Sequence, residues 1–266
     1  MTSQNVRVMA CEQERMACTV NVTEPRQTAR EHVADSNESF LEIEAFLDFI
    51  CPWCLIGTRH LRAAMKRLTE LRPEIELRVV WRSVQLLPNT PSAGEPYQAF
   101  YLARLGGSEV VAARRAQLQQ AGHPAGITFS FDQIPLLPNT AAAHRLLAYA
   151  CAHETEAKQA ALVERLLTAF FVDCEDIADR GVLERLGLEC GLSYDGVSEY
   201  FLTTGRYAGP DANQRPVDAH SVSGVPFMVF NRVHNLSGAH PADVIVEVML
   251  ESIRDQRERN VTPYPD

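Results

Sequence analysis

The sequence predicts an α/β protein whose four-stranded core is interrupted by a large helical insertion, and three observations support this fold class. A strand, a helix and a second strand follow one another within residues 41–81. Short β segments return at residues 225–238. The residues between these two regions have a mainly helical pattern. We therefore expect residues 40–85 and 215–258 to form the core and residues 86–214 to form the insertion.

The composition argues against several classes of protein. Of 266 residues, 46% are hydrophobic and 22% are charged, which is enough apolar material for a core and speaks against overall disorder. The formal charge of −9 disfavours nucleic acid and anionic membranes as partners. No apolar run approaches the ~20 residues that a membrane span needs. We therefore expect neither a nucleic-acid partner nor a membrane segment.

The N-terminal region and the cysteines indicate the cellular compartment in which the protein is expected to work. Residues 1–39 contain no Phe, Tyr or Trp, and we expect them to form a disordered tail. The N-terminus lacks the apolar segment of an export signal, so the sequence predicts a cytoplasmic protein in which thiols stay reduced. The seven cysteines are an odd number, spread thinly along the chain. A close pair of cysteines in such a chain points to redox or metal chemistry rather than to a disulfide framework. The roles of Cys11 and Cys18 stay open.

The first half of the core has the pattern of a βαβ unit. Leu41–Phe49 is short, apolar and bounded, which is typical of a buried strand. Apolar residues from Leu61 to Leu68 recur at helical spacing, and Pro52 suits the first turn of that helix. Ile75–Trp81 alternates and is rich in β-branched residues, so it predicts a second strand.

The insertion contains three amphipathic stretches that predict helices. They cover residues 141–152, 161–171 and 181–192, and all are rich in leucine or alanine. Asn139 and Thr140 precede the first stretch and could cap its helix.

The second half of the core has the pattern of a hairpin followed by a helix. Val225–Phe230 and residues 233–238 flank Asn231 and Arg232, which predict the turn. Pro241 precedes a final helix with one apolar face.

The sequence Cys51-Pro52-Trp53-Cys54 lies where the first strand passes into the helix. The N–H groups and dipole of the helix N-terminus favour a thiolate on Cys51, and Cys54 lies one turn on, within reach of a disulfide. This pattern predicts thiol–disulfide exchange, in which Cys51 attacks or leaves a mixed disulfide and Cys54 resolves it. We expect Pro52 and Trp53 to contact the substrate. Zinc binding would need two further ligands at suitable spacing, and a pair of buried structural thiols is the other alternative.

Val225 and Pro226 form a second candidate site, where a proline opens a strand. A cis Val225–Pro226 bond would turn the backbone N–H and C=O of Val225 toward the cysteines. Those groups could then pair with an extended substrate segment, as in strand addition. An ordinary trans proline is the alternative.

Other titratable residues leave alternatives open. Asp48, three residues before Cys51, is either a proton acceptor near the dithiol or a partly exposed residue at the strand end. Cys174 lies in an acidic loop, where a third redox thiol is one interpretation. The remaining residues of this kind are expected to be structural: His144, His220, Cys151 and Cys190.

Five motifs together resemble the FrnE-type oxidoreductases of the DsbA family. In chain order they are CPWCLIG (51–57), PNTAAAHR (138–145), DIADR (176–180), GVPF (224–227) and SGAHP (237–241). The resemblance implies a thioredoxin-like fold with a helical insertion and a cytoplasmic thiol–disulfide oxidoreductase. It assigns Cys51 as the nucleophile, Cys54 as the resolving thiol and Pro226 as the cis-proline. The chain departs from the family pattern at Leu55, Cys174 and Ser221, which leaves the substrate open.

The same superfamily contains kappa-class glutathione transferases and 2-hydroxychromene-2-carboxylate isomerases, which use serine at the nucleophile position and bind glutathione. Cysteine at both Cys51 and Cys54 argues against that activity, which we keep as the alternative. We expect no tightly bound cofactor and no metal, and glutathione could serve as the reductant. The expected partners are proteins or small molecules that contain thiols or disulfides. A homodimer stays open.

Overall fold

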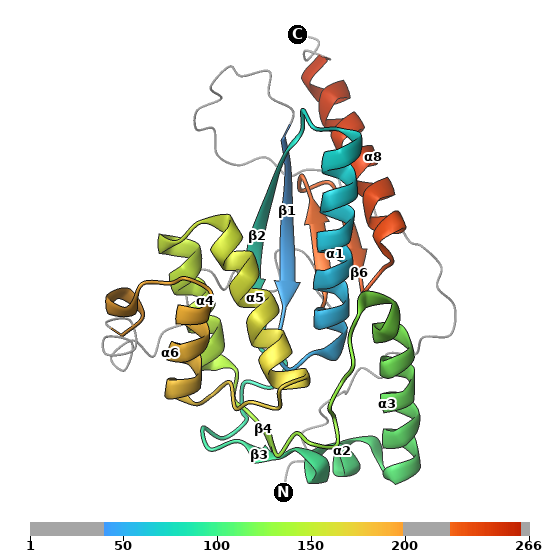
Figure 1. Ribbon diagram of the computed structural model, residues 1–266. Helices are drawn as coiled ribbons and strands as arrows, with labels where there is room; N and C mark the ends of the chain where they lie inside the picture. The colour runs from blue at the N-terminus through green and yellow to red at the C-terminus, as the bar shows by residue number, and fades with distance from the viewer. Residues whose placement is uncertain (1–39, 199–223, 262–266) are drawn as a thin grey trace, which may run out of the picture.

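A four-stranded sheet forms the centre of the computed structural model, which describes residues 40–198 and 224–261 (Figure 1). The strand order is β2-β1-β5-β6. Strand β1 pairs in parallel with β2 and antiparallel with β5, and β5 pairs antiparallel with β6. The strands are β1 (Phe40–Leu47), β2 (Glu76–Ser83), β5 (Phe227–Phe230) and β6 (His234–Ser237). The predicted four-stranded α/β core is therefore confirmed.

Two long helices, α1 (Pro52–Leu71) and α8 (Ala242–Val261), pack against one face of this sheet (Figure 1). Successive side chains of a strand point to opposite faces. Ile43 accordingly joins the main core with residues of α1 and α8, whereas Phe46 packs against Phe227 in a separate apolar cluster. The alternation of β1 thus gives the central strand two buried faces.

The hairpin between β5 and β6 has the predicted turn. Asn231 and Arg232 have φ values of 47° and 61°, and the Val233 N–H donates to the Phe230 carbonyl at 3.0 Å. Because Phe230 pairs with His234, the loop covers residues 231–233. Positive φ at both central residues of the Phe230–Val233 turn suits the right-handed twist of the two strands. The Asn231 side chain also accepts a hydrogen bond from the Glu42 N–H at 2.9 Å, which ties the turn to β1.

The insertion contains the three predicted helices and further elements that the sequence did not reveal. Helices α4 (Ala141–His153), α5 (Glu156–Phe171) and α6 (Arg180–Glu189) match the predicted stretches. The Asn139 side chain accepts a hydrogen bond from the Ala141 N–H at 3.0 Å, whereas Thr140 makes no side-chain cap. The elements that were not predicted are α2 (Tyr97–Leu105), α3 (Ser108–Gly122), a single 3₁₀ turn (His123–Ala125) and a two-stranded sheet of β3 (Glu95–Pro96) with β4 (Leu136–Leu137).

Arg59 connects α1 to the insertion. Its Nε donates to Glu164 of α5 at 2.8 Å, and its Nη1 donates to the carbonyls of Ala125 and Gly126 at 3.1 and 2.7 Å. One half-buried side chain therefore holds two separate parts of the insertion against the helix that begins at the cysteines.

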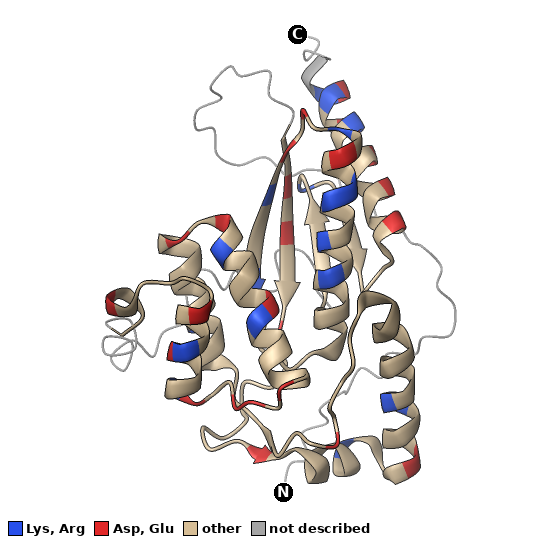
Figure 2. Ribbon diagram, viewed as in Figure 1, with Lys and Arg blue, Asp and Glu red and all other residues tan. Residues whose placement is uncertain are grey.

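Positive and negative side chains both occur along the helices of the insertion and along α8, as Figure 2 shows.

In the part of the chain that the structure describes, no helix is both long and apolar enough to cross a bilayer. The predictions for the tail at residues 1–39, for Cys11 and Cys18 and for His220 and Ser221 lie outside the described residues.

Candidate active site

The two cysteines lie at the N-terminus of α1, as the sequence predicts. Cys51 is the N-cap residue in an extended conformation, and Pro52 takes the first helical position. A proline is tolerated there because the first N–H groups of a helix have no partner within it. The Cys51 N–H donates to the Asp48 carbonyl at 3.1 Å, and the Cys54 N–H donates to the Cys51 carbonyl at 2.9 Å. The chain thus passes from β1 into α1 through a hydrogen-bonded turn.

The two thiols have different environments. Both are free, and the exposed fraction is 5% for Cys51 and 0% for Cys54. Burial raises the pKa of Cys54 well above its ordinary value, and the side chain of Cys51 raises it further. Cys54 is therefore a protonated thiol at neutral pH, behind a cysteine that lies nearer the surface.

The loop before β5 meets the cysteines. The Val225–Pro226 peptide bond is cis, and the Cys51 Sγ donates a hydrogen bond to the Val225 carbonyl oxygen at 3.4 Å. The predicted cis bond and the predicted approach of the Val225 backbone to the dithiol are both confirmed. Residues separated by 174 positions in the sequence thus form one site.

Gly57 allows this approach, because a larger residue there would collide with Pro226. A Cβ atom at Gly57 would lie 2.9 Å from Pro226 Cγ and 3.3 Å from Pro226 Cβ. A proline ring cannot rotate away from such a contact. Although alanine normally stabilises a helix by up to ~1 kcal/mol relative to glycine, overpacking costs about 1–3 kcal/mol. We therefore expect Gly57→Ala to destabilise the protein by about 1–2 kcal/mol in urea unfolding.

Gly187→Ala in α6 is the matched control for this prediction. The nearest atom to a Cβ at Gly187 is 3.5 Å away, an ordinary contact. This variant should be as stable as the wild type or gain up to ~1 kcal/mol. Equal midpoints for the two variants would show that the contact between Gly57 and Pro226 does not limit packing.

Residues of α2 and α3 in the insertion lie near the N-terminal end of α1. The half-buried Trp53 reaches α3, where the Arg114 guanidinium carbon lies 5.8 Å from the centre of its ring. Tyr101 of α2 is also near the site, since burial first and then the charge of Cys51 raise its pKa to about 12. Sequence reasoning missed Tyr101, because no motif marks it and the bounds of α2 were not predicted.

Asp48 is fully buried beneath the cysteines and contacts the insertion. Its Oδ1 lies 3.1 Å from Nε2 of His144 in α4, and its Oδ2 accepts a hydrogen bond from the Leu86 N–H at 2.7 Å. The exposed fractions of Asp48 and His144 are 0% and 2%. The alternative of a partly exposed Asp48 is therefore wrong, because α4 and the segment after β2 cover the end of β1.

The other described cysteines are partly buried. Cys151 and Cys190 pack against the core at its margin. Cys174 has a positive φ of 58°, and its thiol approaches the Ser130 carbonyl at 3.5 Å. Burial raises the pKa of Cys174 and of Cys190. These thiols are therefore less ionised than ordinary cysteines at neutral pH.

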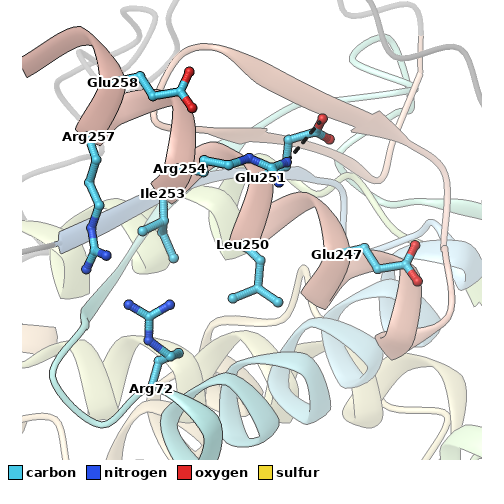
Figure 3. Close-up of a pocket in the computed structure, with 8 residues that line it drawn as sticks. All are labelled: Arg72, Glu247, Leu250, Glu251, Ile253, Arg254, Arg257 and Glu258. Carbon is cyan, nitrogen blue, oxygen red and sulfur yellow. Dashed lines mark ion pairs between the residues drawn. The ribbon is translucent and has the colours of Figure 1, made fainter.

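A metal site and a surface groove are two further features to compare with the dithiol. Within residues 40–198 and 224–261, no three His, Cys, Asp or Glu side chains gather as a metal site would require. A surface groove of about 540 Å³ lies between the C-terminal end of α1 and α8 (Figure 3). Arg72 at its edge follows the C-terminal end of α1, whereas the two cysteines lie at the N-terminal end of that 20-residue helix, so a length of roughly 30 Å separates the groove from the dithiol.

Solved structures with the same fold include redox proteins and an isomerase. A probable DsbA oxidoreductase from Streptomyces coelicolor is 25% identical, over 85% of this chain and 93% of that chain, with a TM-score of 0.72. The cytosolic disulfide reductase DsbM from Pseudomonas aeruginosa, solved with GSH, is 18% identical over 83% and 100%, with a TM-score of 0.54. A 2-hydroxychromene-2-carboxylate isomerase is 15% identical over 83% and 100%, with a TM-score of 0.52.

A comparison with curated proteins gives no significant match. The family model of the DSBA-like thioredoxin domain matches residues 42–249, which include most of β1, the whole insertion and the first part of α8. The predicted thioredoxin-like fold with a helical insertion is thereby confirmed. The chain belongs to the DSBA-like thioredoxin domain family.

Proposed function

We propose that this chain is a thiol–disulfide oxidoreductase of the FrnE type, with Cys51 as the nucleophile and Cys54 as the resolving thiol. The observation that carries the proposal is the pair of free thiols of unequal burial at one helix N-terminus. Such a terminus stabilises a thiolate through its free N–H groups and its dipole. The order of reaction follows, because the outer thiol meets the substrate first.

The reaction proceeds in two exchange steps. The Cys51 thiolate attacks one sulfur of a substrate disulfide, so that a mixed disulfide forms and the other substrate sulfur leaves as a thiolate. Cys54 then attacks the Cys51 sulfur and forms the Cys51–Cys54 disulfide, and the second substrate sulfur leaves. The substrate gains two electrons and the dithiol loses two. The reverse sequence oxidises a substrate dithiol.

The surroundings of Cys51 offer contacts for a substrate. The Val225 carbonyl now accepts the Cys51 S–H, so loss of that proton leaves the oxygen available to an N–H of an extended substrate. Pro52 and Trp53 on one side and Pro226 on the other complete the substrate-binding residues in this proposal. The half-buried Trp53 ring supplies an apolar contact beside the reacting sulfur.

Further parts of the proposal concern organisation and partners. Residues 40–85 and 215–258 form the redox core, and residues 86–214 form the insertion that shapes access to it. The substrates are thiols or disulfides of proteins or small molecules in the cytoplasm, with no tightly bound cofactor. Glutathione is the proposed reductant, in keeping with the fold shared with the cytosolic reductase solved with GSH. The oligomeric state stays open, and light scattering distinguishes a monomer from a homodimer.

A glutathione-dependent transferase or isomerase is the second candidate, because an isomerase shares the fold. The two activities differ in the number of cysteines that they require. Disulfide exchange to completion needs both Cys51 and Cys54, whereas conjugation or isomerisation with glutathione needs no second cysteine.

Equilibration against glutathione tests the proposed function. The full chain is incubated with mixtures of reduced and oxidised glutathione, and the fraction of Cys51–Cys54 disulfide is measured by alkylation and peptide mass spectrometry. We expect a single two-electron transition and catalysed reduction of insulin disulfides. Conjugation or isomerisation of an aromatic substrate with glutathione, without a Cys51–Cys54 disulfide at any ratio, would favour the second candidate.

A further inference from the structure

The first turn of α1 meets a basic part of the insertion. Helices α2 and α3 together contain three arginines and one glutamate, whereas the whole chain has a formal charge of −9. Figure 2 shows the basic stretch of α3 midway along this helix. Trp53 lies against this stretch, with the Arg114 guanidinium carbon 5.8 Å from the centre of its ring. A positive side chain therefore contacts the turn that carries the two cysteines.

Arg114 lies on the stripe of α3 that faces the protein. The buried residues of this helix are Val111, Leu118 and Gly122. Arg114 is three residues after Val111 and four residues before Leu118, so helical periodicity places it on the same face. Its side chain is half-buried. The spacing thus directs the guanidinium toward Trp53 instead of away from the protein.

The Arg114 guanidinium has donors available for a ligand. Its Nη1 donates to the neutral side chain of Gln117 at 2.8 Å. Among the described residues, no ion pair with a carboxylate is recorded for Arg114, whereas the adjacent Arg115 pairs with Asp132. A guanidinium has five N–H donors in one plane and binds a carboxylate through two of them. An amide and an aromatic ring therefore hold the charge of Arg114 in place without neutralising it.

A substrate on Cys51 extends past Trp53, which is two residues further along the chain. Each residue of an extended substrate adds roughly 3.3 Å, and a Glu side chain reaches further from its backbone than this. A carboxylate on a residue next to the reacting cysteine of the substrate therefore comes within reach of Arg114 across the Trp53 ring. Asp and Glu are thus the side chains that this position would favour.

We propose that Arg114, held by Trp53, forms a subsite for a carboxylate close to the reacting disulfide, so that this protein favours acidic disulfide substrates. This inference rests on the proposed function and names the substrate class of the same dithiol. The bonds that form and break are those of the two exchange steps, and Arg114 contributes only hydrogen bonds and charge. Arg114 is a specificity-determining residue in this scheme, and Cys51 and Cys54 are the reacting groups.

Matched peptide disulfides test the charge preference. Three peptides blocked at both ends, Glu-Cys-Glu, Gln-Cys-Gln and Lys-Cys-Lys, are each oxidised to a symmetric disulfide. The reduced full chain is mixed with one disulfide, quenched with acid at successive times and digested. Mass spectrometry follows the loss of the peptide in which Cys51 and Cys54 are both reduced. Each rate is divided by the rate of dithiothreitol with the same disulfide, which removes differences in intrinsic reactivity.

For the wild type we expect the acidic disulfide to react about tenfold faster than the basic one, with the neutral disulfide between them. Arg114→Gln should slow the acidic disulfide about fivefold and change the neutral one less than about twofold, because only a carboxylate loses its partner. Arg114→Lys should retain most of the preference, whereas Arg114→Glu should reverse it. Higher ionic strength should reduce the preference of the wild type.

The neutral peptide separates substrate recognition from an effect on the thiol. A positive charge near Cys51 also favours its thiolate, so this effect alone would make Arg114→Gln slower with all three disulfides by the same factor. The proposal predicts a change in the ratio of the acidic to the basic rate. An equal loss for the three disulfides would overturn it.

Two other arginines provide matched controls. The Arg104 guanidinium carbon lies 5.7 Å from the ring centre of Phe100, which is the same kind of contact within α2. Arg254 of α8 lines the groove at the other end of α1. Arg104→Gln and Arg254→Gln remove one positive charge each and should leave the ratio of rates within about twofold of the wild type. A loss of preference in either control as large as in Arg114→Gln would assign the preference to overall charge and overturn the role of Arg114.

Oxidised glutathione, tested in parallel, distinguishes two sources of the carboxylate. A loss of about fivefold with it in Arg114→Gln would extend the subsite to the carboxylates of a small free molecule. An unchanged rate, together with the loss for the acidic peptide, would restrict the subsite to acidic residues beside a cysteine of a peptide.

The outcomes distinguish this inference from the proposed function. Equal rates for the three peptides with the wild type, or an unchanged ratio in Arg114→Gln, overturn the role of Arg114 alone. A wild-type chain in which no peptide disulfide oxidises Cys51 and Cys54 overturns the proposed function instead.

Discussion

Replacing Cys51 with serine is expected to reduce disulfide exchange to the rate of free glutathione, whereas replacing Cys54 with serine should trap the substrate on Cys51. The hydroxyl of serine cannot form the mixed disulfide, so Cys51→Ser removes the first step. Cys54→Ser retains the first step and lacks the thiol that resolves the intermediate. Insulin reduction measures the loss, and non-reducing gel electrophoresis of the variants measures the trapped adduct.

Cys190→Ser is the matched control for these variants. Cys190 is partly buried on the margin of the core, and burial raises its pKa as it does that of Cys54. Among the described residues, no recorded contact joins Cys190 to Cys51 or Cys54. Its replacement should leave turnover unchanged and trap no substrate. Trapping by Cys190→Ser, or full insulin reduction by Cys54→Ser, would contradict the assigned roles.

Truncation of Phe171 is expected to have the largest effect on stability. The side chain is fully buried where three other rings converge, with ring centres 5.7 Å from Phe129, 6.2 Å from Phe131 and 4.7 Å from Phe170. Phe171→Ala removes these contacts and leaves a cavity that the surrounding helices can fill only in part. We expect a loss of about 3–5 kcal/mol in the free energy of unfolding, measured by urea denaturation followed by circular dichroism.

The same substitution at Phe40 provides the comparison. Phe40 begins β1 and its side chain is 44% exposed, so its removal leaves little cavity. Phe40→Ala should cost less than about 1 kcal/mol. Similar losses for Phe40→Ala and Phe171→Ala would mean that the aromatic cluster of the insertion does not act as a core.

The features that the sequence predicts well are those with local signals. Pro52 marks the first position of α1, and Asn231 and Arg232 mark the hairpin turn, because each depends on the backbone preferences of one or two residues. The place of the dithiol follows directly, since it is the junction of a strand and a helix. The approach of Val225 to Cys51 was expected from Pro226, a proline that opens a strand and whose peptide bond was predicted to be cis.

Other features depend on contacts between distant residues and left no local signal. Strands β3 and β4 have two residues each, too few to show alternation. Helix α3 buries only Val111, Leu118 and Gly122, so its apolar stripe is weak. Tyr101 on the neighbouring helix therefore could not be placed near Cys51.

The contact of Asp48 with His144 illustrates this limit most clearly. Ninety-six positions separate the two residues, and neither lies in a pattern whose spacing relates it to the other. The sequence offered Asp48 both as a proton acceptor and as a surface residue. Only the packing of α4 over the end of β1 decides that it is buried.

The hydrogen-bond ladder of the central sheet has a consequence for how this protein can evolve. Every strand of that sheet belongs to the segments before and after the insertion, so the ladder is complete without any residue of α2 to α6. Mutations that reshape the insertion can therefore be inherited without disturbing the strand pairing of the sheet on which α1 and its dithiol rest. Selection for new substrates can act on the insertion, except where Arg59, Asp48 and their partners join the two parts.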